Sequence, residues 1–321
     1  MSKSSIRKTR RTAPATTEEP TLPATFSPTH KTITFLELPE WQKDNEYIVS
    51  GYRQIQNQWR GCLTSIYAYL HNETVNIHTH LWGAVLFAYF LSTFDDAFLR
   101  QYPGTTWLDS ASIAVFLSSA IFCLSASAFY HTCGCHSEPI AVRCHAFDYL
   151  GICVLTVGSF WPALHFGLFC HPHLQIFYIA SISAIGSGAA YIVLNPEYAK
   201  PTHRVARTSV FIGLGLAAVV PVTHCLFIEG YHKVLFDRGF VWVLISAVLY
   251  ISGAVLYARR IPECFAPGKF DYFFASHQIF HCCVVAAAVA HYVGVLTALG
   301  YSYSQPDICA ATSNQYAQSA F

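Results

Sequence analysis

The stretch 276–299, SHQIFHCCVVAAAVAHYVGVLTAL, contains no Asp, Glu, Lys or Arg. It is long enough to cross the hydrocarbon core of a bilayer, which takes about 20 mostly apolar residues in a helix. Six further stretches have similar length and apolar character, at about 76–94, 110–132, 145–166, 173–194, 206–228 and 240–257. The composition agrees, because only 12% of the residues are charged, against about 25% in a soluble globular chain. The sequence therefore predicts an all-α integral membrane protein with a seven-transmembrane helix bundle, in the plasma membrane or an internal membrane.

Lys and Arg are unevenly divided between the two sides of the predicted bundle. Sixteen of them lie on the side of the N-terminus, whereas Arg100, Lys233 and Arg238 lie on the other side. Because Lys and Arg concentrate in cytoplasmic loops, this predicts a cytoplasmic N-terminus and, after seven crossings, an external C-terminus. That orientation is opposite to the one of G-protein-coupled receptors and argues against that class. The near balance of 19 Lys and Arg with 18 Asp and Glu also argues against nucleic acid as a partner.

The residues outside the seven stretches fall into three parts. Residues 1–40 combine basic residues, Pro and Thr with few large apolar side chains, which predicts a disordered cytoplasmic leader without the apolar core of a signal peptide. Residues 41–74 are predicted to be a cytoplasmic amphipathic segment that includes a helix lying at the membrane face. Its apolar side chains recur at near-helical spacing: Ile55, Trp59, Leu63, Ile66 and Tyr69. Residues 75–299 form the predicted transmembrane domain, and residues 300–321 form a short external tail.

Several polar side chains share one depth in the predicted bundle. The second stretch runs inward, so Ser127 and His131 lie near its cytoplasmic end. The third stretch runs outward, which places Asp148 about one turn above the same face, and the seventh also runs outward, with His277 and His281 in its first turns. Ionisable residues inside membrane spans are candidates for function.

This set of residues is suited to binding a metal ion. His277 and His281 are four residues apart, so they project from one helix face and can chelate one ion, and His131 would supply a third nitrogen. Three protein ligands with an open fourth position are typical of a catalytic Zn²⁺ site. Asp148 could orient a water molecule or accept its proton, and Ser127 lies one turn from His131. The set predicts a zinc site suited to hydrolysis of an amide or ester, although an isolated pair of histidines at this spacing also arises by chance, and a lone serine in a helix more often bonds its own backbone.

At these residues the sequence resembles the progestin and adipoQ receptor family, which includes the adiponectin receptors and haemolysin III-like proteins. The resemblance covers about residues 38–299 and rests on ordered motifs: LPEW (38–41), KDNEY (43–47), ETVNIHTH (73–80), SAFYH (127–131), FDYLGI (147–152) and HQIFH (277–281). It implies a zinc site at His131, His277 and His281, with Ser127 and Asp148 near the metal, in a zinc-binding domain of residues 75–299. It also implies the inverted topology, receptor activity, a role in lipid and zinc homeostasis, and ceramidase-like hydrolysis. One departure is His78, which stands where the mammalian receptors have tryptophan.

The other histidines and cysteines are interpreted mainly as packing groups. His80 and His145 are expected to make interhelical hydrogen bonds or interface contacts near the cytoplasmic face, and His224 and His291 to be packing or cavity-lining groups in the outer halves of their spans. The loop Cys133-Gly-Cys135-His136 lacks a second pair of ligands, so we interpret it as a solvated loop rather than a metal site. Two cysteines face the outside and could form a disulfide: Cys170 and Cys309.

Three functions of different classes follow from the sequence and the resemblance. The leading hypothesis is a zinc-dependent hydrolase that acts on a membrane lipid amide such as ceramide and also serves as a receptor. The second is a signalling receptor in which zinc is structural and an extracellular protein ligand shifts the helix packing. The third is a zinc-homeostasis protein whose bound metal reports or buffers zinc.

Overall fold

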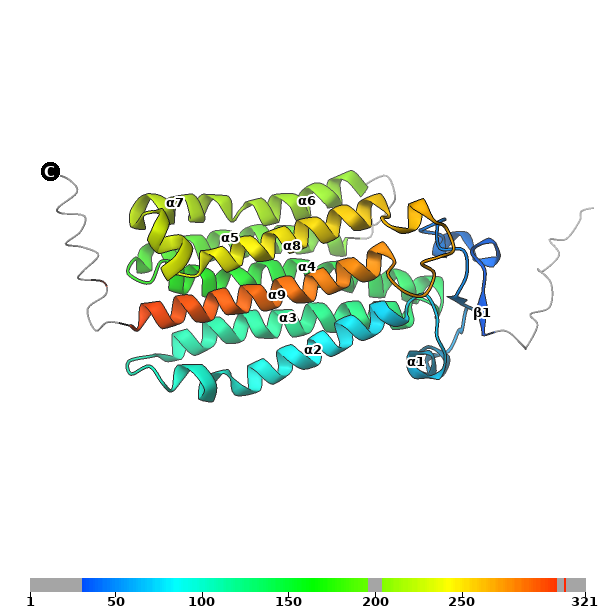
Figure 1. The fold of residues 1–321 in the computed structure, drawn as a ribbon, viewed down its shortest axis with the longest axis horizontal. Coiled ribbons are helices and arrows are strands. Elements are labelled where there is room, and N and C mark those ends of the chain that lie inside the picture. The colour runs from blue at the N-terminus through cyan, green and yellow to red at the C-terminus, as the bar shows by residue number, and fades with distance from the viewer. Residues whose placement is uncertain (1–30, 196–203, 305–308, 310–321) are drawn as a thin grey trace, which may run out of the picture. The chain divides into compact units, whose positions relative to one another are not determined.

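The computed structural model describes residues 31–195, 204–304 and Cys309. Within this part of the chain, helices lie side by side along the length of a bundle, and a short N-terminal segment lies at one end of it (Figure 1). The helices are α1 (Trp59–Ala68), α2 (Thr74–Phe94), α3 (Trp107–Cys133), α4 (Glu138–Gly167), α5 (Pro172–Leu194), α6 (Arg204–Leu216), α7 (Val219–Glu229), α8 (Phe240–Arg259) and α9 (Ser276–Ser302). Two short strands, β1 (Thr32–Ile33) and β2 (Tyr52–Arg53), precede them.

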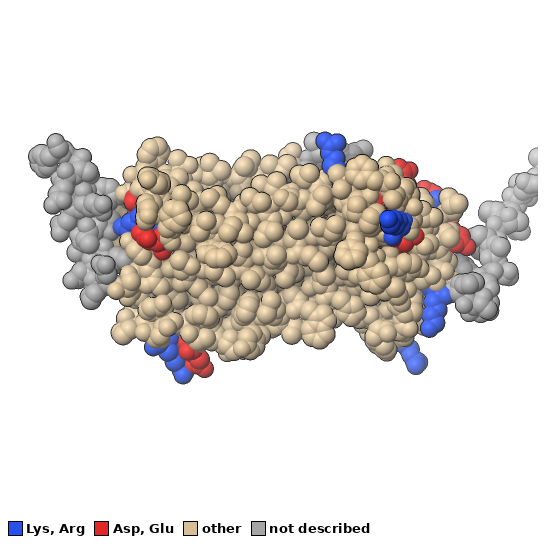
Figure 2. All heavy atoms as spheres, in the orientation of Figure 1, with Lys and Arg blue, Asp and Glu red and all other residues tan. Residues whose placement is uncertain are grey.

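Six helical stretches of the described residues are long and apolar enough to cross a membrane. They are α3, α4, α5, residues 209–229, residues 240–265 and α9. The face drawn in Figure 2 carries its charged side chains toward the two ends of the bundle, with an uncharged band between them. Such a band is what a hydrocarbon core requires of the surface that it surrounds. The prediction of a helical integral membrane protein is confirmed.

The first predicted span corresponds to α2, which packs against α3 and α9. It is 21 residues long, but its first turns hold Asn76, His78 and His80 and are more polar than the rest. These polar side chains lie at the end of the bundle that also carries α1. The helix therefore brings polar groups to one end of an otherwise apolar bundle.

The predicted span at 206–228 is interrupted. The helix breaks at Ala217 and Ala218, so that α6 and α7 follow each other along the same side of the bundle (Figure 1). Pro221 accounts for the break, because it has no N–H to donate to the carbonyl of Ala217 and its ring would clash with that carbonyl in a regular helix. The other predicted spans agree with single helices to within a few residues at most ends.

The segment before the bundle has regular structure from Thr32 onward. Strands β1 and β2 pair in antiparallel fashion, with Thr32 opposite Arg53 and Ile33 opposite Tyr52. The predicted leader boundary at residue 40 is therefore too late, because backbone pairing with residues far along the chain orders the stretch that follows residue 31. Residues 1–30 lie outside the described residues.

Helix α1 carries the predicted amphipathic pattern, but it starts after Ile55 and ends before Tyr69. It buries Cys62 and Ser65 against the bundle. The side chains of Trp59 and Leu63 are 45% and 50% exposed, although the ring of Trp59 also contacts the rings of Phe129 and His136. The apolar stripe is thus left on the surface, as an interfacial helix requires.

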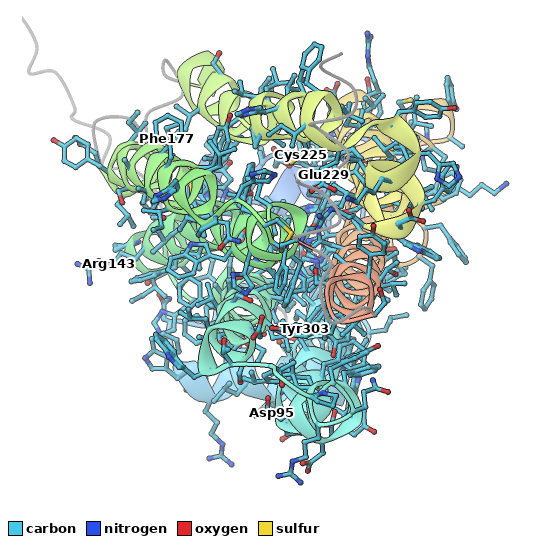
Figure 3. The ribbon with its side chains drawn as sticks, turned by 90° about the vertical axis from the view of Figure 1, so that its left-hand side faces the viewer. Asp95, Arg143, Phe177, Cys225, Glu229 and Tyr303 are labelled. Carbon is cyan, nitrogen blue, oxygen red and sulfur yellow. A yellow bond between two sulfur atoms is a disulfide. The ribbon has the colours of Figure 1, made fainter. Side chains whose placement is uncertain are left out.

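The far end of the bundle is held by a disulfide and by ion pairs, and Figure 3 looks along the bundle from this end. Cys170 and Cys309 form the disulfide that the sequence allowed. Glu229 accepts from Arg238 at 2.6 Å and from Lys233 at 2.8 Å, and Arg238 also donates to the carbonyl of Phe166. Arg100 pairs with Asp96 at this end as well, so all three cations that were predicted to lie outside are paired with an acid here.

Candidate metal centre

Three histidines meet at the end of the bundle that carries α1. His131 comes from the last turns of α3, and His277 and His281 come from the first turns of α9. Each offers a ring nitrogen, and the three nitrogens lie within 4.8 Å of one another. His131 and His281 are buried and His277 is half-buried. The structure thus brings together the three residues that the sequence analysis named as metal ligands.

The first turn of α9 is fixed by hydrogen bonds from three directions. Ser276 donates its backbone N–H to Glu263 Oε2 at 2.8 Å, and its hydroxyl donates to the other oxygen of the same carboxylate. Gln278 donates its side-chain amide to the carbonyls of Asn72 and Tyr272. Because His277 lies between Ser276 and Gln278, these contacts set the direction from which its imidazole enters the site.

A carboxylate and a carbonyl orient two of the imidazoles. His131 Nδ1 lies 2.7 Å from Glu73 Oε2, and His281 Nδ1 lies 3.1 Å from the carbonyl oxygen of Asn76. Both oxygens only accept, so Nδ1 carries the hydrogen in each ring and Nε2 presents a lone pair. Hydrogen bonds of this kind are usual behind metal-ligating histidines.

Asn76 completes this second layer by donating its side-chain amide to Glu73 Oε2 at 2.7 Å. The sequence analysis assigned no role to Glu73 or Asn76. The sequence indicates these two residues only by their position. They are three residues apart at the start of α2, Glu73 lies about one turn before the predicted span, and both belong to the motif 73–80.

One nitrogen of the site has a buried lone pair without a partner. Among the described residues, His131 Nε2 lies in the interior with no hydrogen bond. A buried polar atom in this state is unfavourable unless something else satisfies it. The chemistry of three converging imidazole nitrogens, one of them unsatisfied, fits a borderline metal ion such as Zn²⁺.

Ser127 and Asp148 form a second polar contact beside the histidines. Ser127 is buried one turn before His131, and its hydroxyl lies close to the carboxylate of Asp148 on α4. Ser112 and Ser119, on the same helix, bond backbone carbonyls three residues earlier instead. Ser127 therefore departs from the usual behaviour of a helical serine and links α3 to the half-buried Asp148.

His80 stacks on His281, with ring centroids 3.7 Å apart and an angle of 8° between the rings. Both of its ring nitrogens are buried without a hydrogen bond to the described residues. It therefore makes an interface contact, one of the two roles expected for it, and belongs to the immediate surroundings of the metal centre. His145 stacks on Tyr130 and contacts Tyr149.

Three other histidines lie outside the cluster. His78 contacts the carbonyl of Ile66 in α1 at 2.9 Å. His224 bonds to the hydroxyl of Tyr178, and His291 donates to the carbonyl of Ser159. The interpretation of His224 and His291 as packing groups is confirmed.

The loop after α3 differs from the prediction of a solvated loop. Cys133 and Cys135 are fully buried rather than solvated, because the loop folds back under α1. The sulfur of Cys135 contacts that of Cys62, and Cys133 hydrogen-bonds to Cys144 at the start of α4. The fold thus places two further cysteines, Cys62 and Cys144, next to the two cysteines of this loop.

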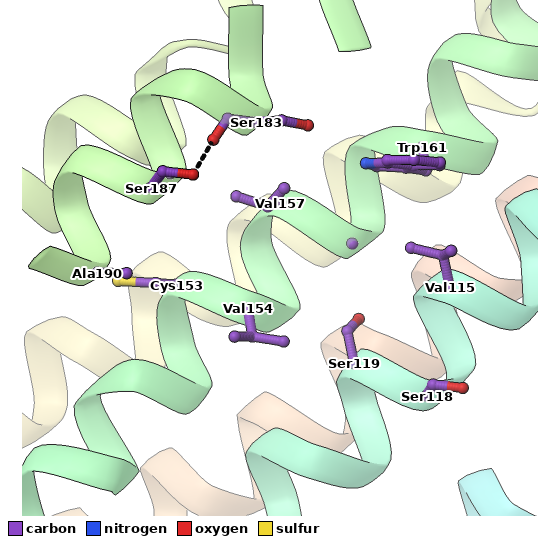
Figure 4. Close-up of a pocket in the computed structure, with 12 residues that line it drawn as sticks. Val115, Ser118, Ser119, Cys153, Val154, Val157, Trp161, Ser183, Ser187 and Ala190 are labelled. Atoms are coloured by element: carbon purple, nitrogen blue, oxygen red, sulfur yellow. Dashed lines mark hydrogen bonds between the residues drawn. The ribbon is translucent and has the colours of Figure 1, made fainter. Parts of the chain in front are cut away.

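A groove of about 530 Å³ runs between α3, α4 and α5 (Figure 4). Its lining is mainly apolar or small and includes Ser119, Cys153, Trp161 and Ser187. Cys153 lies five residues after Asp148 on α4, which corresponds to about 8 Å along a helix. The groove therefore begins about 8 Å beyond Asp148 along α4, extends toward the far end of the bundle and is not lined by the histidine cluster, Ser127 or Asp148.

Comparisons with known proteins match the stretch that contains the three histidines. A family model described as "Haemolysin-III related" matches residues 68–292. Progestin and adipoQ receptor-like protein 1 of Caenorhabditis elegans is 38% identical over 271 residues, which cover 84% of this chain and 62% of the relative. The adiponectin receptor protein of Drosophila melanogaster is 36% identical over 269 residues, 83% of this chain and 59% of the relative.

A shorter relative is matched over most of its length. The ADIPOR-like receptor IZH2 of Saccharomyces cerevisiae is 37% identical over 260 residues, which cover 81% of each chain. In contrast, this chain spans about three fifths of the length of the nematode and fly relatives. The matched region of the family model includes Glu73, the three histidines and Asp148.

Proposed function

The chain belongs to the haemolysin-III related family of multi-pass membrane proteins, together with adiponectin receptor-like proteins, and from this premise we propose that it is a zinc-dependent hydrolase of a membrane lipid amide. His131, His277 and His281 would hold Zn²⁺, and Asp148 and Ser127 would act beside it. The substrate would be a ceramide-like lipid. One observation carries the proposal: the buried Nε2 of His131, which faces two further imidazoles and has no partner among the described residues.

The donor set supports a catalytic role for the ion. When bound by three imidazoles, Zn²⁺ supplies Lewis-acid chemistry, in which a carbonyl is polarised and water becomes acidic enough to attack it near neutral pH. Glu73 would hold His131 in the tautomer with a free Nε2 lone pair, as its 2.7 Å contact with Nδ1 indicates. The backbone carbonyl of Asn76 would do the same for His281.

Asp148 would act as the base. Its carboxylate would accept the proton of the attacking water and deliver it to the leaving amine nitrogen. The hydroxyl of Ser127, which lies close to this carboxylate, would donate to one of its oxygens, hold that oxygen in place and leave the other free for water. Ser127 would therefore be a positioning residue for Asp148.

The groove between α3, α4 and α5 supports a lipid as the substrate. Its lining is mainly apolar or small, and it begins about one and a half helical turns from Asp148. An acyl chain lying in this groove would place the attached amide at the depth of the metal centre. Entry would occur sideways from the bilayer, between the helices.

We also propose that α2 crosses the membrane, which brings the number of spans to seven. In this proposal the N-terminus is cytoplasmic and the C-terminus is outside. The sixteen-to-three division of Lys and Arg supports this orientation. The disulfide between Cys170 and Cys309 supports it as well, because disulfides persist outside the cytosol. A tag after residue 321 should then bind antibody on intact membranes, and labelling only after permeabilisation would contradict the orientation.

The main alternative is a receptor in which zinc braces the bundle without chemistry. The fly and yeast relatives are named as receptors, and a receptor of this kind would have an extracellular protein as its partner. A zinc-homeostasis protein would be a further variant of this alternative. Both share the metal centre with the hydrolase proposal, and they differ in the need for Asp148.

The experiment that separates these functions measures fatty acid release from ceramides by purified full-length protein in nanodiscs. Asp148→Asn should lower the rate by at least about 100-fold, because general-base catalysis is removed, while zinc content stays unchanged. Asp95→Asn is the matched control, since Asp95 is exposed at the other end of the bundle and bonds only Ser110. Zinc-loaded wild-type protein that releases no fatty acid from a panel of ceramides would contradict the hydrolase and favour the receptor.

A further inference from the structure

Four buried cysteines gather at the end of the bundle that carries α1. They come from three separate places: α1, the end of α3 with its following turn, and the start of α4. They are Cys62, Cys133, Cys135 and Cys144. At the far end the cysteines Cys170 and Cys309 are oxidised, whereas these four are free thiols. The metal centre uses none of the four.

Cys62 and Cys135 form the pair with the shortest described contact. Their sulfur atoms lie 3.7 Å apart, and their exposed fractions are 0% and 2%. A disulfide bond is about 2.05 Å long, so the two sulfurs need to approach by less than 2 Å. This approach would join α1 to the turn after α3, which are far apart in the sequence.

A buried positive charge accompanies this pair. Arg53 is 4% exposed and donates to Ser65 Oγ at 2.9 Å and to the backbone carbonyls of Thr132 and His131. All of these acceptors are neutral, and within the described part of the chain the guanidinium forms no salt bridge with a carboxylate. A buried cation without a counter-charge favours a thiolate nearby.

The ionisation of Cys135 follows from these neighbours. The hydrogen bond with Cys62 lowers the pKa of Cys135, burial raises it, and the charge of Arg53 lowers it again, with a net shift downward. The thiolate is the form of cysteine that reacts with oxidants. Cys135 is therefore the thiol that attacks the oxidant, and Cys62 is the thiol that then attacks the oxidised sulfur of Cys135.

We propose that Cys62 and Cys135 are a redox-responsive thiol pair, which a hydroperoxide converts into a disulfide. The thiolate of Cys135 attacks the peroxide O–O bond, which gives a sulfenic acid and, after proton uptake, one molecule of water or alcohol. The sulfur of Cys62 then attacks the sulfenic sulfur, the S–S bond forms, and water leaves with the thiol proton. Two thiols are oxidised and one hydroperoxide is reduced to two hydroxyl-containing products.

The disulfide would fix α1 to the turn that follows His131. This helix leaves Trp59 and Leu63 about half exposed and buries the neighbouring Cys62 against the bundle. Oxidation would therefore lock the exposed apolar face of α1 in its present position. Reduction would leave α1 held by noncovalent contacts alone.

To test this, purified full-length protein is freed of reductant and then treated with one equivalent of hydrogen peroxide. The sample is then denatured in N-ethylmaleimide, digested and analysed by mass spectrometry. We expect the linked peptides of Cys62 and Cys135 to accumulate faster than linked peptides of Cys133 and Cys144, because the charge of Arg53 favours the thiolate of Cys135. The linked peptides of Cys170 and Cys309 should be present before and after treatment.

Matched variants separate the pair from its neighbours. Cys144→Ser should leave the linkage rate unchanged, and Cys135→Ser should leave Cys62 fully alkylated. Equal or faster linkage of Cys133 to Cys144, or alkylation of Cys62 and Cys135 throughout the treatment, would overturn the proposal.

Discussion

In the histidine cluster, two imidazoles have one nitrogen bonded to an acceptor of the protein, and their other nitrogens lie close together. Glu73 engages Nδ1 of His131 and the carbonyl of Asn76 engages Nδ1 of His281. The consequence is that the tautomers are fixed before a metal arrives. A site prepared in this way loses less entropy on binding than one in which the rings rotate freely.

Replacement of Glu73 should therefore weaken metal binding without removing a ligand. We expect Glu73→Gln to lower zinc affinity by about 10- to 100-fold, the usual effect of removing a partner of a metal-ligating histidine. Competition with a chelator of known affinity measures this change. Glu40→Gln is the control, because Glu40 forms an exposed ion pair with Lys43. Equal zinc affinity of Glu73→Gln and wild type would show that this carboxylate does not support the site.

The three histidines could be predicted from the sequence because span order alone gives each one its depth in the membrane. Glu73 and His80 could not be placed in the same way. The contact between Glu73 and His131 depends on how α2 is rotated about its axis, and stacking of His80 on His281 depends on how closely α2 and α9 approach. The hydropathy of the sequence indicates neither the rotation of α2 nor its distance from α9.

At the scale of the helices, the approach of α3 to α4 positions Asp148 beside Ser127. Gly151 lies one turn after Asp148, and a Cβ atom placed on it would lie 2.9 Å from the Cα of Cys123. Cys123 in turn lies one turn before Ser127. The two backbones can therefore approach at this level only because Gly151 lacks a side chain.

Gly151→Ala should separate these helices. We expect a loss of about 1–3 kcal/mol in the free energy of unfolding, as for overpacking in a close contact, and a slower hydrolysis rate. Gly188→Ala is the matched control, since a Cβ there meets no atom within 4 Å. It should not lower the stability, because alanine stabilises a helix relative to glycine. Thermal unfolding of both variants checks this. Equal melting temperatures would contradict the close-contact account.

The helices themselves were largely predictable, and the exceptions have local causes. Apolar length located the spans, but it merged α6 with α7 because the break at Pro221 lies inside a continuous apolar stretch. The start of regular structure at Thr32 was missed for a different reason. Its strand is two residues long and is ordered by pairing with Tyr52 and Arg53, which no local pattern indicates.

Considered as a whole, the described bundle has two chemically different ends. One end holds the histidine cluster, the free thiols and the N-terminal strands, and the other holds the disulfide and the ion pairs of Glu229. Charge counting predicted that the two ends would differ. The clustering of Cys62 with the loop after α3 could not be predicted, because the position of α1 relative to the bundle is a tertiary property.

The metal content of the purified full-length protein tests the central claim most directly. Wild type should carry about one zinc ion per chain, and the double variant His277→Ala/His281→Ala should carry almost none, because one histidine cannot hold the ion. His291→Ala is the matched control, as a buried histidine of the same helix that bonds only a backbone carbonyl. It should keep the zinc of the wild type. Equal zinc content in the wild type and the double variant would contradict the account.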